Sequence, residues 1–226
     1  MLYGEYKKFV ERTGCQMTFD QELREELISG EEVFSGNLIK VEHWQVLLPD
    51  GKTALREIVR HIGAVAIVPL DENGIVTLVR QHRVAVDKIT LEIPAGKLNF
   101  KGEDPLSAAS RELEEETGLR AAHWQQLTRL NTTAGFCDEC IVLYVATSLS
   151  QYHCHTDEDE FIHTEKMPLS QAIRMVMTGE IQDAKTIAGL LMAQNLFYAH
   201  NNPNVFVHPN TKRMPGGISS RQADNF

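Results

Sequence analysis

Four glutamates lie close together in residues 111–118, where their spacing can bring carboxylates onto one face of a helix. At about 100° per residue, Glu112, Glu115 and Glu116 lie at roughly 0°, 300° and 40° around the helix axis. Glu114 lies at roughly 200° and points away from the other three. Clustered carboxylates repel one another, whereas Mg²⁺ is bound by a few carboxylates together with waters and phosphate oxygens. The segment therefore predicts a magnesium site, with a solvated acidic helix face as the alternative.

The helix that carries these carboxylates is predicted over residues 105–117, and both of its ends are marked. Asp104 is suited to cap it, Pro105 suits its first position, and Gly118 suits the residue just past its end. An apolar stripe on the opposing side is expected to dock the helix, and it consists of Leu106, Ala109 and Leu113. Just upstream, residues 92–98 end a strand and enter the loop before the helix, so backbone carbonyls and glutamates can meet over one metal.

The other elements predict an α/β layered domain. Two β-hairpins are expected, one over residues 37–60 around Asp50-Gly51 and one over residues 63–80 around Asp71–Gly74. Further strands are predicted over residues 127–131 and 141–147, and further helices over residues 169–178 and 184–198. The residues from 200 onward are expected to be extended or disordered.

Composition narrows the class of protein. The 226 residues carry a formal net charge of −9, which disfavours an extended phosphate-backbone footprint and hence nucleic acid as a partner. Residues 103–116 hold six acids and one base, and residues 157–160 hold four acids, so these two segments contain the whole excess of negative charge. No apolar run approaches the ~20 residues that span a bilayer, and no secretory signal is recognisable. We therefore expect no membrane partner and a cytoplasmic location.

The segment from residue 96 to residue 119 resembles the signature of the Nudix hydrolase family, G-x5-E-x7-R-E-U-x-E-E-x-G-U, where U is aliphatic. Its fixed positions are filled by Gly96, Glu103, Arg111, Glu112, Leu113, Glu115, Glu116, Gly118 and Leu119. Six residues rather than five separate Gly96 from Glu103. The extra residue falls in the loop before the helix, where an insertion is readily absorbed and leaves the helical register unchanged.

This resemblance implies a Nudix α/β/α sandwich with a mixed sheet. It divides the chain into an N-terminal β-hairpin region (residues 1–59), a catalytic domain (60–199) and the tail (200–226). It implies Mg²⁺, with Mn²⁺ as a substitute. The metal ligands it implies are the carbonyl of Ala95 and the carboxylates of Glu112, Glu115 and Glu116, with Glu115 also catalytic and Glu103 supporting.

The sequence is similar in particular to the ADP-ribose pyrophosphatase branch, through residues 91–98 and 135–139. In that branch the N-terminal region helps to build a homodimer with shared active sites. The resemblance implies hydrolysis of a nucleoside diphosphate derivative, giving AMP and ribose 5-phosphate from ADP-ribose. Ala134 stands where the branch usually has proline. Alternatives therefore stay open: another nucleotide sugar such as GDP-mannose, a dinucleoside polyphosphate, or a non-catalytic nucleotide-binding domain.

The same branch implies the remaining functional residues. A base that activates water usually lies on a late loop, which points to Glu160, followed by Phe161 and an aliphatic residue, with Glu158 as the second choice. Arg83 aligns with an arginine that the branch uses to bind substrate, and Arg56 in the hairpin region and Glu92 are further candidate substrate-binding residues. A guanidinium suits a diphosphate because its fork can bind phosphate oxygens bidentately.

Overall fold

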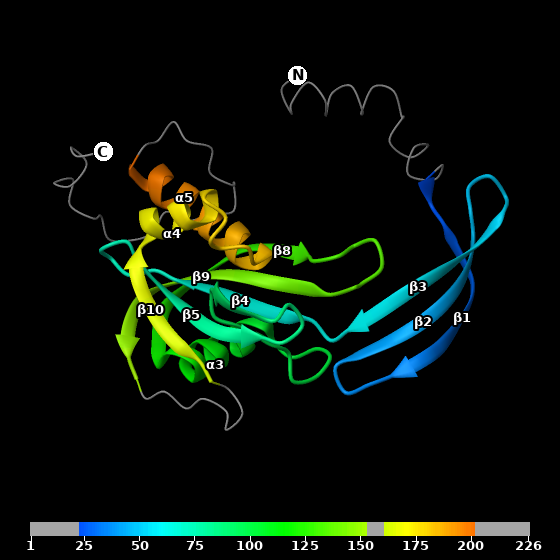
Figure 1. The fold of residues 1–226 in the computed structure, drawn as a ribbon, viewed down its shortest axis with the longest axis horizontal. Coiled ribbons are helices and arrows are strands. Elements are labelled where there is room, and N and C mark those ends of the chain that lie inside the picture. Colours follow the sequence, from blue (N-terminus) through cyan, green and yellow to red (C-terminus); the bar gives the residue numbers. More distant parts are fainter. Residues whose placement is uncertain (1–22, 153–160, 202–226) are drawn as a thin grey trace, which may run out of the picture. The chain divides into compact units, whose positions relative to one another are not determined.

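The computed structural model describes residues 23–152 and 161–201, with side chains up to residue 197. The chain divides into two compact units (Figure 1). The N-terminal unit contains the residues up to His61 together with Thr133–Asp138. The second unit contains Ile62–Thr132 and the residues from Glu139 onward.

The N-terminal unit is built on a three-stranded antiparallel sheet in the order β1-β2-β3. Its strands are β1 (Glu26–Ser35), β2 (Ile39–Leu47) and β3 (Thr53–His61). Strands β2 and β3 form the hairpin expected around Asp50-Gly51, and Gly51 adopts the positive φ of 82° that such a turn favours. The sequence did not predict β1, because its acidic and glycine residues hide the alternation of a strand.

A four-stranded sheet in the order β7-β4-β9-β8 forms the centre of the second unit. Its strands are β4 (Ala64–Pro69), β7 (Ala95–Lys97), β8 (Leu119–Asn131) and β9 (Cys140–Gln151). Strand β4 pairs parallel with β9, whereas its pairing with β7 and the pairing of β8 with β9 are antiparallel. The sheet is therefore mixed, as the family resemblance implies.

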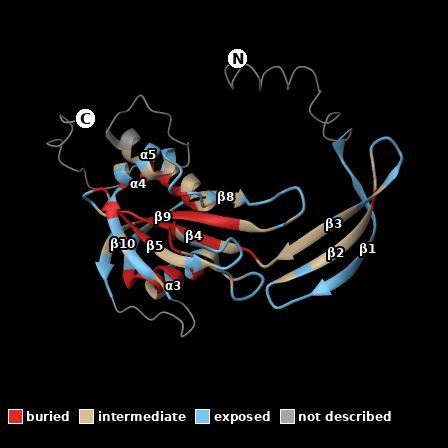
Figure 2. Ribbon diagram, viewed as in Figure 1, coloured by how far each residue is buried: buried red, intermediate tan, exposed pale blue. Residues whose placement is uncertain are grey.

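Helices cover both faces of this sheet, and alternating residues of β4 contact the two layers. Val65 and Ile67 pack with helix α3 (Pro105–Thr117), whereas Ala66 and Val68 pack with α4 (Leu169–Met177) and α5 (Ala184–Asn201). Figure 2 shows buried residues concentrated in β4 and β9 between the helices, and exposed residues along β1. The result is an α/β/α sandwich.

A second sheet of this unit, in the order β10-β5-β6, corrects the expected hairpin over residues 63–80. Its strands are β5 (Ile75–Arg83), β6 (Lys88–Glu92) and β10 (His163–Pro168). A turn does join β4 to β5, but a single bridge, Leu70 to Val76, links the two segments before they enter different sheets. Among the described residues, no helix is long and apolar enough to cross a membrane.

Candidate functional site

Helix α3 has the bounds and caps that the sequence predicts. The Asp104 carboxylate accepts a hydrogen bond from the Ser107 N–H at 2.9 Å, and Gly118 ends the helix at a φ of 65°. Ala109 and Leu113 are fully buried against the sheet, whereas Leu106, expected beside them, is 40% exposed. The buried positions fix the rotation of the helix and therefore the direction in which its glutamates point.

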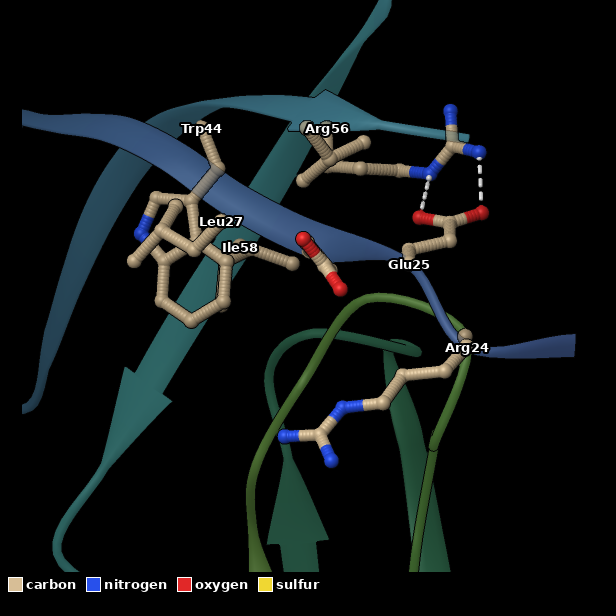
Figure 3. A pocket seen from close by; sticks show the side chains of 9 residues that line it. Arg24, Glu25, Leu27, Trp44, Arg56 and Ile58 are labelled. Carbon is tan, nitrogen blue, oxygen red and sulfur yellow. Dashed lines mark hydrogen bonds and ion pairs between the residues drawn. The ribbon is translucent and has the colours of Figure 1, made fainter. Parts of the chain in front are cut away.

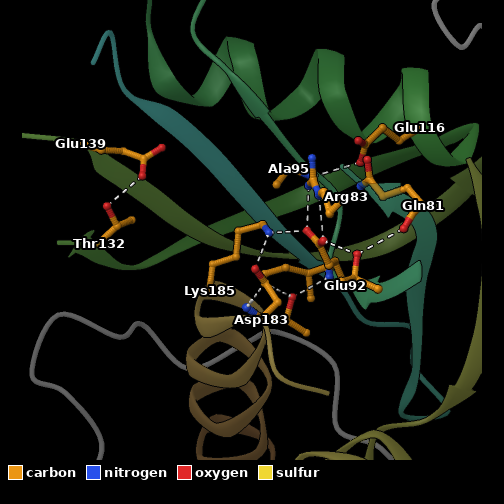
Figure 4. Close-up of polar contacts among 12 residues, drawn as sticks. Gln81, Arg83, Glu92, Ala95, Glu116, Thr132, Glu139, Asp183 and Lys185 are labelled. Atoms are coloured by element: carbon orange, nitrogen blue, oxygen red, sulfur yellow. Dashed lines mark hydrogen bonds and ion pairs between the residues drawn. The ribbon is translucent and has the colours of Figure 1, made fainter. Parts of the chain in front are cut away.

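Glu116 lies against the start of β7, the short strand that precedes α3 (Figure 4). It is only 4% exposed, and its Oε2 accepts a hydrogen bond from the Ala95 N–H at 3.0 Å. Glu116 is therefore hydrogen-bonded to the same residue whose carbonyl is an expected metal ligand. Glu114, by contrast, pairs with Arg120 at 2.6 Å, as expected for the glutamate on the other face of the helix.

Glu112 is packed onto the backbone of Gly96. A Cβ atom at Gly96 would lie 2.0 Å from Cδ of Glu112 and 2.1 Å from its Oε1. Only glycine therefore leaves room for the carboxylate next to Ala95. Glu112 is 9% exposed, so the packing holds a carboxylate largely out of solvent.

Arg111 joins the carboxylates on this face of α3. Its Nη1 donates to Glu112 Oε1 at 2.7 Å and to Glu115 Oε2 at 3.0 Å, the latter across one helical turn. Glu103 lies 3.7 Å from the same guanidinium and accepts a hydrogen bond from the Asn99 N–H at 2.6 Å. Glu103 thus supports the loop that contains the additional residue.

The donor chemistry of this face suits a hard divalent cation, because the expected ligands are all oxygen atoms. They are the carboxylates of Glu112, Glu115 and Glu116 and the carbonyl of Ala95. The close packing of Glu112 on Gly96 and the contact of Glu116 with Ala95 bring helix α3 and strand β7 together at this point. In the described part of the chain, no three acidic, histidine or cysteine side chains are already gathered around one metal position. Two of the carboxylates instead share Arg111.

The Gly96 cradle leads to a direct prediction. Gly96→Ala is expected to lower hydrolytic activity by about 10–100-fold, the usual cost of disturbing the support of a metal ligand, because the new Cβ must displace the Glu112 carboxylate. Steady-state rates at saturating Mg²⁺ measure the effect, with the thermal unfolding midpoint as the control for folding. Wild-type activity in a folded Gly96→Ala protein would contradict the role of the cradle.

A second polar cluster joins β5, β6 and the start of α5 (Figure 4). The Glu92 carboxylate, 2% exposed, accepts hydrogen bonds from Arg83 Nε at 2.9 Å and Arg83 Nη2 at 2.8 Å. It also accepts from Thr90 Oγ1 at 2.7 Å and from Lys185 Nζ. The Arg83 side chain remains 42% exposed, so this guanidinium is accessible to a ligand.

Burial raises the pKa of Glu92, but the hydrogen bonds and positive charges of Arg83 and Lys185 outweigh it and lower the pKa to about 2. Glu92 is therefore ionised throughout the neutral range. Its hydrogen bonds in turn raise the pKa of Arg83, with a smaller contribution from the charge of Glu116. The acidic face of α3 and the Arg83 cluster thus lie within electrostatic range of each other.

The low pKa of Glu92 predicts a pH-dependent contribution to stability. A carboxylate whose pKa falls from 4.5 to about 2 on folding contributes on the order of 3 kcal/mol above pH 4.5. That contribution is lost as the pH falls toward 2. Urea unfolding of the wild type and of Glu92→Gln between pH 7 and pH 3 measures it. We expect the difference in unfolding free energy between the two proteins to shrink below pH 4.5, and a difference independent of pH would contradict the prediction.

Arg56 lies in the N-terminal unit, where it lines a pocket of about 710 Å³ (Figure 3). Its guanidinium pairs with Glu25 through two hydrogen bonds, of 3.0 and 2.5 Å. Leu27, Trp44 and Ile58 supply apolar surface to the same pocket. The pocket therefore combines an aromatic ring, aliphatic groups and a cation.

Two of the expected functional residues, Glu158 and Glu160, lie outside the described residues, as does the tail from residue 202. Conversely, Asp183, Lys185 and Thr186 join the Arg83 cluster, although the sequence analysis did not single them out. The signal that was available is the aspartate directly before a predicted helix, which is typical of an N-cap.

The sequence matches the family that its carboxylate helix resembles, and it is similar to known proteins. The NUDIX domain family matches residues 60–190. An ADP-ribose pyrophosphatase of Bacillus subtilis is 42% identical over 166 residues, covering 73% of this chain and 89% of the relative. A methanol dehydrogenase activator of Bacillus methanolicus is 42% identical over 172 residues, covering 75% of this chain and 92% of the relative.

A solved structure described as an ADP compounds hydrolase shares the fold with a TM-score of 0.70 at 22% identity. The superposition covers 78% of this chain and 96% of that one. Enzymes of the Nudix family typically use a divalent metal, in keeping with the oxygen donors on α3. The capped carboxylate helix, the α/β/α sandwich and these matches together show that the chain belongs to the Nudix hydrolase family.

Proposed function

We propose that this chain is a Mg²⁺-dependent pyrophosphatase that hydrolyses ADP-ribose or a related nucleoside diphosphate sugar. The observation that carries the proposal is the contact of two helix carboxylates with the strand before the helix. Glu116 is hydrogen-bonded to Ala95, and Glu112 packs on Gly96, within electrostatic range of Arg83. The similarity to a B. subtilis ADP-ribose pyrophosphatase supports the choice of substrate. Water adds across the P–O–P bridge, and ADP-ribose yields AMP and ribose 5-phosphate.

In the proposed mechanism, Arg83 binds the diphosphate while Glu92 holds two of its guanidinium nitrogens. Among the described residues Nη1 has no hydrogen-bond partner, so a phosphate oxygen can take that position. Glu112, Glu115, Glu116 and the Ala95 carbonyl would hold the metal, which when bound neutralises charge on the phosphate oxygens. Glu160 accepts the proton of the attacking water.

A substrate panel tests this function. Wild-type protein with Mg²⁺ is incubated with ADP-ribose, GDP-mannose and a dinucleoside polyphosphate, and phosphate is measured after phosphatase coupling. The highest kcat/KM is expected for ADP-ribose. GDP-mannose as the best substrate would favour the nucleotide-sugar alternative, which relatives named GDP-mannose pyrophosphatase at 31–32% identity also support. Binding without hydrolysis of any compound would point to a non-catalytic nucleotide-binding domain.

We further propose that the chain acts as a homodimer through the N-terminal sheet. All ten residues of β1 are exposed, and Leu27, Ile28 and Phe34 are each more than half exposed. An edge strand that exposes these apolar side chains is suited to pair with another copy. Light scattering is expected to give twice the 25.5 kDa chain mass, and Phe34→Asp is expected to favour the monomer. A monomeric wild type at micromolar concentration would contradict this proposal.

A further inference from the structure

We propose that Lys185, at the start of α5, is a positioning residue that fixes the guanidinium of Arg83 through the carboxylate of Glu92. The inference rests on the proposed function in one respect, namely that Arg83 binds the diphosphate. It extends the site beyond the carboxylate helix, to a helix on the opposite face of the central sheet.

The first step of the argument is the way in which Glu92 is shared. Its Oε1 accepts from Arg83 Nε and Thr90 Oγ1, and its Oε2 accepts from Arg83 Nη2 and Lys185 Nζ. Each oxygen therefore has one bond to Arg83 and one bond to another group. Without Lys185, Oε2 keeps only its bond to Arg83, and the carboxylate loses one of the contacts that hold it in place.

The second step is that Lys185 is itself held in place. Its side chain is 11% exposed, and Nζ lies 2.9 Å from Asp183 Oδ1. Asp183 Oδ2 accepts hydrogen bonds from the Thr186 N–H at 2.9 Å and from Thr186 Oγ1 at 2.6 Å, which caps the first turn of α5. Lys185 thus extends from an ordered helix start, and its ammonium is positioned before any ligand binds.

The third step is that the same helical turn also holds the main chain beside Glu92. The Ile93 N–H donates to Thr186 Oγ1 at 3.0 Å, and Thr186 is fully buried. Two residues further on, the Ala95 N–H bonds to Glu116. The start of α5 therefore contacts the side chain of Glu92 through Lys185 and the backbone of Ile93 through Thr186. This is a rigid support for a guanidinium that must meet a substrate in a fixed orientation.

The charges favour the same role. Arg83 and Lys185 bring two positive charges, and Glu92 and Asp183 bring two negative charges, all within one set of ion pairs. Because Asp183 also pairs with Lys185, the charge of Lys185 is balanced and the carboxylate of Glu92 stays available to the partly exposed Arg83.

The first experiment measures the orientation of Arg83 without any substrate. The exchange of its Nε–H with water is followed by ¹⁵N–¹H NMR, with the signal assigned from its absence in Arg83→Lys. Lys185→Met is expected to accelerate this exchange by about tenfold or more, the contribution of one hydrogen bond between charged groups, and Lys185→Arg to restore part of the protection. Lys52→Met, which removes a lysine that is 79% exposed, is the matched control and should leave the exchange unchanged. Lys185→Gln replaces Lys185→Met if the latter does not fold.

The second experiment measures hydrolysis of ADP-ribose by the same full-length proteins with Mg²⁺. Lys185→Met is expected to raise KM by about tenfold with a smaller change in kcat, because the binding of the diphosphate is what depends on Arg83. In an Arg83→Met background, Lys185→Met should raise KM no further, since the residue through which it acts is already absent.

The two experiments separate this inference from the proposed substrate. Unchanged Arg83 exchange in Lys185→Met would overturn the inference whatever the substrate is. Faster exchange with an unchanged KM, or additive effects on KM in the double variant, would also overturn it. A wild type that does not hydrolyse ADP-ribose would refute the proposed substrate alone, and the exchange rates would still decide whether Lys185 positions Arg83.

Discussion

Glu116→Gln is expected to lower the Mg²⁺-dependent turnover by more than about 100-fold. Loss of an outer partner of a metal ligand costs about 10–100-fold, so loss of a ligand charge itself should exceed that range. The substitution keeps the size of the side chain, and a glutamine oxygen can still accept the hydrogen bond from the Ala95 N–H. The fold should therefore survive. Steady-state rates with ADP-ribose, measured over a range of Mg²⁺ concentrations, give the effect.

Glu114→Gln is the matched control for this prediction. It removes the same charge from the same helix, but Glu114 lies on the face that pairs with Arg120. We expect its turnover to stay close to that of the wild type. A wild-type rate in Glu116→Gln would contradict the metal assignment. Equal losses in both variants would show that the helix needs its total charge rather than a particular carboxylate.

Local signals explain why α3 could be predicted residue by residue. Its N-cap, its first-position proline and its terminal glycine each act within one helical turn, so the sequence contains the full information for its bounds. The rotation of the glutamates follows from the helical period once the bounds are known. For the same reason, the Asp50-Gly51 turn identified the β2–β3 hairpin.

Partners that lie far apart in the chain could not be predicted in this way. The alternation in residues 63–80 indicates two strands, but it does not say that β4 and β5 enter different sheets after one bridge. Lys185 reaches Glu92 across 93 residues, and no local pattern encodes an ion pair of that separation. Glu92 was expected to bind substrate, and its hydrogen bonds to Arg83, Thr90 and Lys185 likewise could not be predicted from a local pattern.

Glu160→Gln is expected to lower kcat by about 10²–10⁴-fold, the range over which a general base contributes. Glu160 lies outside the described residues, so this prediction rests on its place in the sequence, directly before Phe161. Strand β10 begins at His163 opposite Arg80, so the chain enters β10 at the end of β5 that carries Arg83. The pH profile of kcat should lose its acid limb in the variant, because the carboxylate that takes the proton from water is no longer present to be deprotonated.

Glu158→Gln provides the control, since it removes an identical charge two residues away in the same acidic run. If the run acts only through its negative charge, the two variants should lose the same activity and both should keep the acid limb. If one carboxylate takes the proton from water, only its own variant loses the limb. A wild-type kcat in Glu160→Gln together with a large loss in Glu158→Gln would assign the base to Glu158. Because a general base must lie within hydrogen-bond reach of one water, we expect a single residue, Glu160, to account for the effect.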